Sequence, residues 1–270
     1  NQLFFNPKLD KAHNLSGLVL FETNSESADY LRVESSNSAS VLLRDPSADA
    51  RFDAVNSSTV MDRSIGVLGQ LFYSYRDQYL ITLNSRLDGV SRLGKESRWG
   101  LFPSASVAWR FSQASFFRDL DIFDDSKIRA SYGSTGNISG LKEYTRHATY
   151  GTVSGLPNQY SVHSALYPKS IQLDRVRWET VTQWNVGLDL AMFNRFDLTF
   201  EVYDKVTSDI LWEDYDIPGS SGYSSLELFN GGKVSNRGWE LLFRIYPVKS
   251  DDLTMRLNFN ISHNVNTYIE

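Results

Sequence analysis

Apolar and polar residues alternate along two neighbouring stretches of the chain, within residues 178–192 and 196–205. In the first stretch, the apolar residues at every second position are Trp184, Val186, Leu188, Leu190 and Met192. In the second stretch they are Phe196, Leu198, Phe200 and Val202. A period of two gives a β-strand one apolar and one polar face. The short break at Phe193-Asn194-Arg195 therefore predicts a β-hairpin with a very short turn.

The polar faces of this hairpin carry charges, whereas its apolar faces are uninterrupted. Asp189, Asp197, Glu201 and Lys205 fall on the polar side. Strands in globular proteins usually have about five or six residues, but a tilted strand needs about nine to eleven to cross a bilayer. The pattern favours an antiparallel transmembrane β-barrel with lipid outside and water or polar contents inside. A soluble sandwich would give the same alternation with its apolar face turned inward.

The same alternation recurs along the whole chain and indicates an all-β fold. Besides the central hairpin, we expect strands over residues 3–5, 12–22, 64–75, 79–88, 103–111, 126–136, 238–246 and 253–264. Long polar loops are expected over residues 23–63, 89–102, 137–177 and 208–236. They alternate with shorter connections around Asn6, Asp77, Asp119, Asn194 and Ser250. Outer-membrane barrels have short periplasmic turns and long extracellular loops, so this order also favours a barrel.

Aromatic residues gather near the short connections, where a membrane interface would lie. They are Phe4, Phe5, Tyr75, Tyr79, Phe111, Phe193, Phe196 and Tyr246. Rings at this level form the aromatic girdle of a membrane barrel. One helical turn is expected around Phe116-Phe117, in the connection over residues 112–125.

Composition excludes several classes of protein. The 270 residues are 41% hydrophobic and carry a net charge of -5, with no basic run that would suit nucleic acid. The chain has no cysteine, so disulfides and thiolate metal sites are excluded. Its apolar runs are too short for a membrane helix, and its first residues do not form a signal peptide. Because the strand pattern continues to both ends, residues 1–270 are expected to be part of a larger barrel.

A series of short motifs in a fixed order resembles a known family. The motifs are Arg86-Leu87-Asp88-Gly89 with Ser91-Arg92; Arg98-Trp99-Gly100-Leu101-Phe102-Pro103-Ser104; Arg129-Ala130-Ser131-Tyr132-Gly133 with Thr135-Gly136-Asn137; Trp178-Glu179-Thr180 with Gln183; Tyr203-Asp204-Lys205 with Thr207; Gly222-Tyr223; Asn230-Gly231-Gly232; Asn236-Arg237-Gly238-Trp239-Glu240; and Asn258-Phe259-Asn260. The series is similar to the C-terminal half of SusC-like (RagA-like) TonB-dependent outer-membrane transporters of Bacteroidetes. Leu93 and Val90 depart from the family pattern, where an aromatic residue and Ser are usual.

The resemblance implies a fold, partners and a location. The fold would be a plugged barrel of about 22 strands, with a plug domain and a TonB-contacting segment upstream that are not found in this sequence. The partners would be TonB and a SusD-like surface lipoprotein that closes over the barrel as a lid. The function would be proton-gradient-driven import of glycan oligomers or peptides across the outer membrane of a Gram-negative bacterium.

Candidates for catalysis or metal binding are weak. His13, His147, His163 and His263 show no metal spacing. The acidic pairs Asp124-Asp125 and Glu213-Asp214 are typical of solvated loops. No nucleophile-elbow motif is present. We therefore expect no enzyme activity, no cofactor and no metal. Six glycines are interpreted as strand-end residues whose turns need unusual backbone angles: Gly89, Gly133, Gly136, Gly231, Gly232 and Gly238.

Aromatic residues in two long loops are the predicted binding residues. They are Trp212, Tyr215 and Tyr223 in one loop, and Tyr144, Tyr150, Tyr160 and Tyr167 in the other. Flat rings stack on sugars and peptide side chains at low entropic cost. The alternative is that these rings pack loop against loop or contact the lid.

Three functions remain open from the sequence alone. The first is an active importer, and the second is a passive porin or surface adhesin on a similar barrel. The third, a soluble carbohydrate-binding or hydrolytic β-protein, does not explain the alternating loop lengths or the charged faces.

Overall fold

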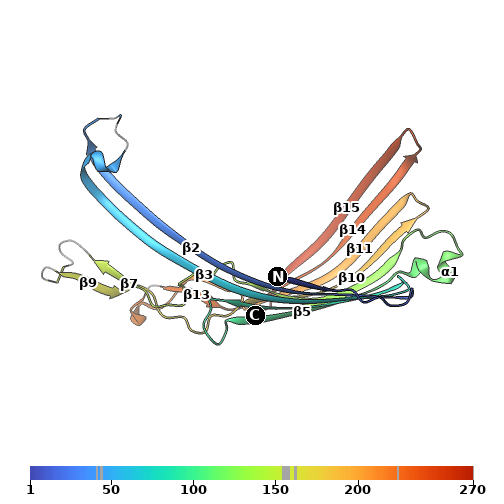
Figure 1. Cartoon of the computed structure of the whole chain (residues 1–270), viewed down its shortest axis with the longest axis horizontal. Helices are drawn as coiled ribbons and strands as arrows, with labels where there is room; N and C mark the ends of the chain where they lie inside the picture. Colours follow the sequence, from blue (N-terminus) through green and yellow to red (C-terminus); the bar gives the residue numbers. More distant parts are fainter. Residues whose placement is uncertain (41, 43–44, 154–158, 161–162, 224, 270) are drawn as a thin grey trace.

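The chain forms one large, open antiparallel sheet with small loop hairpins at one end (Figure 1). The structure is a computed structural model that describes residues 1–270 except 41, 43–44, 154–158, 161–162, 224 and 270. The large sheet has ten strands in the order β1-β2-β3-β4-β5-β6-β10-β11-β14-β15. Figure 1 shows it curving upward at both sides like a section of a cylinder wall.

The strands of the large sheet are mostly long. Their bounds are β1 Gln2–Phe5, β2 His13–Ser38, β3 Asp49–Tyr75, β4 Tyr79–Val90, β5 Trp99–Trp109, β6 Lys127–Asn137, β10 Glu179–Met192, β11 Phe196–Ser208, β14 Lys233–Lys249 and β15 Thr254–Tyr268. The ten strands expected from the alternation all lie in this sheet, and the short one expected over residues 3–5 is β1. Within the described residues, no helix is long and apolar enough to span a membrane.

The central hairpin is confirmed in register and turn. Met192 stands opposite Phe196 across β10 and β11, and Phe193 and Asn194 have φ values of 56° and 52°. The turn between β3 and β4 has the same form, with φ of 52° at both Arg76 and Asp77. Two successive residues with positive φ give the twist that tight antiparallel hairpins need.

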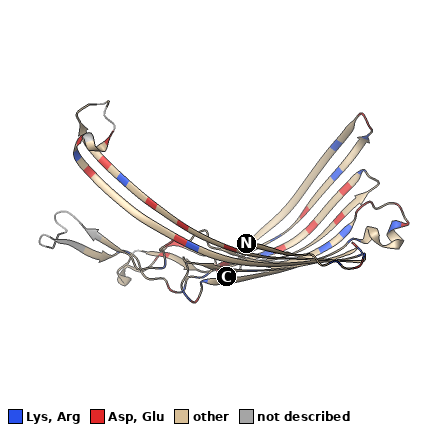
Figure 2. Ribbon diagram, in the orientation of Figure 1, with Lys and Arg blue, Asp and Glu red and all other residues tan. Residues whose placement is uncertain are grey.

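The two faces of the sheet differ in chemistry, as the alternation predicts. Leu188 stands opposite Phe200 on β11 and Ile128 on β6. One residue further, Asp189 lies on the other face, where Arg129 Nε donates to its carboxylate at 3.2 Å. Figure 2 shows acidic and basic residues along the strands themselves.

The apolar face stays open to the surroundings. Trp184 and Val186 are 42% and 46% exposed, and Tyr132 is 60% exposed. A soluble sandwich would cover these side chains with a second layer. Among the described residues no second layer covers this face, and its exposed apolar side chains fit contact with lipid.

The expectation that residues 23–63 form a loop is wrong. They continue β2 and β3 as an almost regular ladder, broken only by a bulge between Glu34 and Ser35. The last pair between β3 and β4 is Ser64 with Val90, so residues 21–38 and 49–63 project beyond the neighbouring strands. We call this part the projecting hairpin; it extends about 50 Å at about 3.4 Å per residue. Both of its faces are exposed, so the sequence carries no alternation that would reveal the strands.

Two further expectations about the strands are corrected. β5 begins at Trp99 rather than Pro103. Its pairing with β4 continues past Pro103 and Ser85 as far as Trp99 and Gly89, whereas its pairing with β6 stops at Ser104. Proline lacks the N–H that a further pair with β6 would use. Gly89, Gly133, Gly136 and Gly238 lie inside strands. Among the described glycines, only Gly222 and Gly232 have positive φ, so of the six strand-end glycines the turn explanation holds only at Gly232.

Room for a neighbouring side chain explains most of the strand glycines. A Cβ built on Gly136 would lie 2.1 Å from Phe102 Cζ. One on Gly238 would lie 2.4 Å from the His263 carbonyl oxygen and 2.7 Å from the Tyr203 hydroxyl. The large side chain across the ladder occupies the space that the glycine leaves.

Small elements fill the connections. The helical turn predicted around Phe116-Phe117 is confirmed as α1 Ser115–Arg118, after η2 Phe111–Gln113. The loop over residues 138–178 contains β7 Tyr150–Val153, β8 Gln159–Tyr160 and β9 His163–Pro168. The loop over residues 209–232 contains β12 Leu211–Asp216, η3 Gly219–Ser221 and β13 Ser225–Asn230, and the tip of the projecting hairpin contains η1 Pro46–Ala48.

Candidate functional site

The long loops fold onto one another and form a core of their own. Its buried residues are Val90, Leu93, Leu141, Val176 and Leu228, with Ile138, Leu173, Trp178 and Leu211 packed against them. They come from residues 90–98, 138–178 and 209–232, which we call the loop cluster. Most of the deeply buried apolar residues of the described chain lie here rather than on the sheet. The loops are therefore held in one arrangement by apolar burial.

Glu179 joins two of these loops at the first position of β10. Its Oε1 accepts from Asn137 Nδ2 at 3.0 Å, and its Oε2 accepts from the Leu211 amide at 3.2 Å. The side chain therefore links the end of β6 to the start of β12. This contact gives the Trp178-Glu179-Thr180 motif a structural role.

Asn230 makes a similar connection from the Asn230-Gly231-Gly232 motif. Its Nδ2 donates to the carbonyl oxygens of Arg177 and Asp209, both at 2.9 Å, and its Oδ1 accepts from the Arg177 amide at 2.8 Å. The Arg177 guanidinium also donates to the Asp209 carboxylate, which raises the pKa of Arg177 above its usual value.

Arg92 ties the base of the projecting hairpin to the loop cluster. Its guanidinium lies 3.0 Å from the Asp62 carboxylate and 3.2 Å from that of Glu143, and it donates to the Leu141 carbonyl at 2.8 Å. Partial burial of Asp62 raises the pKa of its carboxyl, but donation from Ser91, Arg92 and the Arg63 amide outweighs this and leaves the pKa below its ordinary value.

Three of the sequence-predicted aromatics take part in packing. The Tyr144 hydroxyl accepts from the Met61 amide of the projecting hairpin at 3.0 Å. Trp212 Nε1 donates to the Gly231 carbonyl at 2.8 Å, and the Tyr215 ring lies 4.6 Å from that of Phe229. These contacts hold the three side chains against neighbouring segments, and Tyr144, Trp212 and Tyr215 still expose 43%, 44% and 53% of their surface.

Two other predicted aromatics are available for contact. Tyr150 and Tyr167 lie on the paired strands β7 and β9, and they are 67% and 44% exposed. A Cβ built on Gly151 would lie only 2.6 Å from Tyr167 Cζ. The glycine therefore leaves the space that the Tyr167 ring occupies. Tyr223 is half-buried after η3, and the Tyr160 side chain falls outside the described part of the molecule.

A groove in the loop cluster was missed by the sequence analysis. It has a volume of about 450 Å³ and lies between residues 172–177 and residues 226–230. Its lining includes Leu173, Arg175 and Phe229. No local sequence pattern predicts this groove, because its two walls are far apart in the sequence. The buried side chains of Leu228 and Val176 bring them together.

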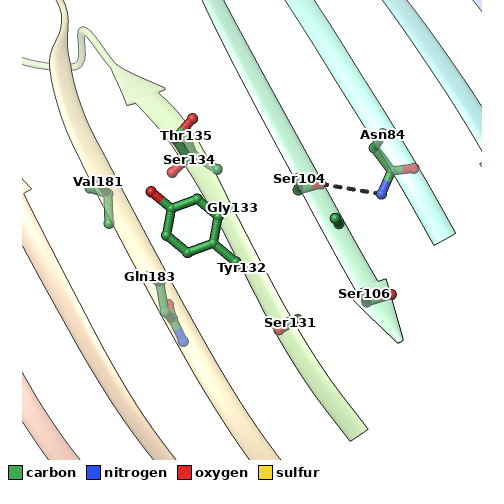
Figure 3. A pocket seen from close by; sticks show the side chains of 11 residues that line it. Asn84, Ser104, Ser106, Ser131, Tyr132, Gly133, Ser134, Thr135, Val181 and Gln183 are labelled. Carbon is green, nitrogen blue, oxygen red and sulfur yellow. Dashed lines mark hydrogen bonds between the residues drawn. The ribbon is translucent and has the colours of Figure 1, made fainter. Parts of the chain in front are cut away.

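The polar face of the sheet offers a second candidate surface. Arg129 lies between Asp189 at 3.2 Å and Glu201 at 2.5 Å, and Asn185 donates to Glu201 at 2.7 Å. Beside this charged group lies an uncharged notch of about 420 Å³ (Figure 3). Hydroxyl and amide side chains line most of it, with Asn84 donating to Ser104 at 3.2 Å. Such a wall is suited to water and polar solutes.

Within the described residues, no group of three or more His, Cys, Asp or Glu side chains is placed to hold a metal ion. The acidic pair Asp124-Asp125 makes contacts instead of only facing solvent. Asp124 accepts from the Asn194 amide at 2.6 Å, and Asp125 pairs with Arg110 at 3.1 Å.

Comparison with known protein families assigns this chain to one of them. The family described as "TonB dependent receptor-like, beta-barrel" matches residues 1–269. The chain belongs to this family. Receptors of the TonB-dependent family lie in the outer membrane of Gram-negative bacteria, and the resemblance inferred from the ordered motifs is confirmed.

Individual TonB-dependent receptors are similar to it along most of its length. "TonB-dependent receptor SusC" of Bacteroides thetaiotaomicron is 30% identical over 223 residues, covering 81% of this chain and 22% of that protein. "TonB-dependent receptor P3" of Formosa agariphila is 32% identical over 207 residues, covering 76% of this chain and 20% of that protein. The chain thus spans about a fifth of the length of these curated relatives.

Two solved structures share the fold. "Structure of the RagAB peptide transporter" gives a TM-score of 0.88 at 22% identity, covering 99% of this chain and 29% of the other. The siderophore receptor PirA of Pseudomonas aeruginosa gives 0.55 at 16% identity, covering 98% and 42%. In such barrels the apolar face meets lipid and the polar face meets the lumen. The charged group around Arg129 is therefore assigned to the lumen side.

Proposed function

We propose that this chain forms part of the wall and the outer loops of a TonB-dependent importer of oligomeric nutrients. The substrates would be glycan oligosaccharides or peptides too large for passive pores. A SusD-like surface lipoprotein would close over the long-loop end as a lid. TonB would supply energy from the inner membrane to other parts of the receptor. The host would be a Gram-negative bacterium of the Bacteroidetes type.

The observation that carries this proposal is the ordered loop cluster. A passive pore needs only an open mouth, whereas this end has a buried apolar core and charged ties through Arg92, Glu179 and Arg177. In the same loop cluster, the paired strands β7 and β9 expose Tyr150 and Tyr167, one on each face of the pair. An ordered platform with exposed rings is suited to holding an oligomer or a lid.

The names of similar proteins also support a role in import. One neighbour is titled a peptide importer, and a curated relative is the receptor SusC. Both glycan and peptide therefore remain within the proposal, because aromatic rings pack against sugars and peptide side chains alike.

The test is uptake by the receptor that carries this chain. The double substitution Tyr150→Ala with Tyr167→Ala should reduce growth on the cognate oligomer, or co-purification of the lid lipoprotein, without changing receptor abundance. The matched control is Tyr150→Phe with Tyr167→Phe, which keeps both rings. Normal growth and normal lid recovery with the alanine variant would refute the role of these rings.

Two further measurements separate the alternative functions. A passive porin would transport the oligomer after TonB is deleted, and an adhesin would bind it without uptake. A cysteine in place of the exposed Ser221 should react with an impermeant reagent on intact cells if the long loops are extracellular. Labelling only after the outer membrane is permeabilised would reverse the topology.

A further inference from the structure

The connection between β5 and β6 carries a cluster of five rings at the short-turn end of the sheet. The cluster consists of Trp109, Phe111, Phe116, Phe117 and Phe123, which we call the ring cluster. Phe111 lies at the centre, with centroids 5.1 Å from Phe117, 5.5 Å from Phe123 and 5.9 Å from Trp109. Edge-on contacts of this kind stabilise more than area burial alone.

The ring cluster is built on the apolar face of the sheet. Trp109 stands opposite Tyr79 on β4 and Ile128 on β6, and Ile128 in turn stands opposite Leu188. On the other side of the connection, Phe123 forms a bridge with Met192 of the central hairpin. Residues directly opposite one another in a ladder share a face. The ring cluster therefore continues the lipid-facing surface of the barrel.

Polar contacts fix the connection in this position. Arg110 pairs with Asp125 at 3.1 Å, and Asp124 accepts from the Asn194 amide of the neighbouring turn at 2.6 Å. The Asp124 amide donates to the Ala191 carbonyl at 2.8 Å. These contacts fix the end of the connection against β10 and its turn to β11.

Two apolar side chains project from this fixed base without being covered. Phe116 is 71% exposed although its ring touches Phe117 at 5.3 Å, and Leu120 is 46% exposed. Phe116 lies in α1, and Leu120 lies in the turn that follows it, where the Leu120 amide donates to the Phe117 carbonyl at 3.3 Å. Arg118 lies between them in sequence and falls on a different side of the turn, where it is exposed.

We propose that α1 and the following turn form an anchor in the lipid–water interface of the periplasmic leaflet, with Phe116 and Leu120 inserted among phospholipid chains. The partner is the phospholipid surface because the ring cluster is continuous with the lipid-facing strands and lies at the short-turn end. Short turns of such barrels face the periplasm. Exposed aromatic and aliphatic side chains close to a charged residue suit this interface.

The test uses nitroxide labels on the complete receptor in vesicles of phosphatidylethanolamine and phosphatidylglycerol. Single substitutions Phe116→Cys and Leu120→Cys place labels on the proposed inserted side, and Gln113→Cys and Arg118→Cys place them on the exposed polar side. Collision rates with oxygen, which concentrates in lipid, and with a water-soluble nickel chelate are then compared. The ratio of oxygen to nickel collisions should be several-fold higher at positions 116 and 120 than at 113 and 118.

Equal ratios at all four positions would overturn the proposal. So would labels at 116 and 120 that neither reagent reaches, because that result would mean that another protein covers them. A second measurement does not depend on labelling. Phe116→Asp with Leu120→Asp should lower the thermal unfolding midpoint of the receptor in these vesicles, whereas Arg118→Asp should leave it unchanged. An unchanged midpoint for both variants would also count against the anchor.

Discussion

The indole of Trp99 lies over Gly89, its partner across the pair of strands β4 and β5. A Cβ built on Gly89 would lie 2.5 Å from Trp99 Cζ3, closer than real atoms come. The two residues come from separate motifs of the ordered series, Arg86-Leu87-Asp88-Gly89 and Arg98-Trp99-Gly100. Their contact gives a physical reason for the two motifs to occur together. Gly89 of the first motif leaves the space that the Trp99 ring of the second motif occupies.

Substitution at Gly89 should therefore disturb the wall of the barrel. Gly89→Val should destabilise the receptor by about 1–3 kcal/mol, the usual cost of overpacking. The folded fraction can be measured by heat-modifiable mobility in gels. Gly69→Val is the matched control, because nothing lies within 4 Å of a Cβ at Gly69. Adding Trp99→Ala to Gly89→Val should restore part of the loss; no recovery would show that the ring is not the obstacle.

The assignment of faces predicts a large difference between neighbouring positions. Leu188 is on the apolar face, whereas Thr199 stands opposite Asp189 on the polar face. Arginine at a lipid-facing midplane position costs about 2–4 kcal/mol. Leu188→Arg should therefore reduce the yield of folded receptor strongly, while Thr199→Arg gains an acidic neighbour and should be tolerated. The reverse order would mean that the sheet has been placed inside out.

Glu179 is predicted to control the order of the loop over residues 209–232. Glu179→Ala removes the carboxylate oxygens that accept hydrogen bonds from Asn137 Nδ2 and from the Leu211 amide. Each of these hydrogen bonds contributes about 1 kcal/mol to stability. Hydrogen exchange at the Leu211 amide should become faster, with little change in the strands. Glu179→Gln retains one carbonyl acceptor and should give an intermediate rate. Unchanged exchange in both variants would show that the apolar core alone orders this loop.

The contact between Asp62 and Arg92 should depend on pH. Asp62 lies beyond the last β3–β4 pair, on the long-loop side. The pKa of its carboxyl is below the ordinary 3.8, so its stabilising contribution is complete above that value and is lost as the pH falls through the lower folded pKa. The protection factor of the Arg63 amide, which donates to Ser91 Oγ, compares its exchange rate with the intrinsic rate at each pH. It should stay high at pH 5 and fall only below pH 3.8. Asp62→Asn should show the faster exchange already at neutral pH.

The sequence predicts those strands that separate two different environments. In β10 and β11 lipid on one side and water on the other impose alternation, so strands, turn and register can all be inferred. The projecting hairpin is wetted on both faces, and Leu31, exposed by 68%, is followed by Arg32 without any burial to distinguish them. The composition of residues 23–63 therefore suggests a loop, although backbone pairing makes most of these residues part of β2 and β3.

The candidate site was predictable only in its residue types. Tyr150 and Tyr167 are exposed as a binding role requires, but nothing local shows that Tyr144 bonds to Met61 or that Trp212 bonds to Gly231. The core formed by Leu93, Leu141 and Leu228 could not be predicted either, because its members come from three loops that are far apart in the sequence. Long-range contacts between irregular segments leave no periodic trace.

The projecting hairpin has a consequence for how relatives can diverge. Residues 49–63 pair only with β2, so the receptor can change the length of this arm without altering the barrel wall. Removing or adding one residue on each strand next to the tip preserves every remaining pair, and each added pair shifts the tip by about 3.4 Å. An unmatched single residue would turn all side chains beyond it to the opposite face unless a bulge absorbed it, as the one between Glu34 and Ser35 does. The distance that this arm projects beyond the neighbouring strands can therefore change by one residue pair at a time, without any change in the sheet.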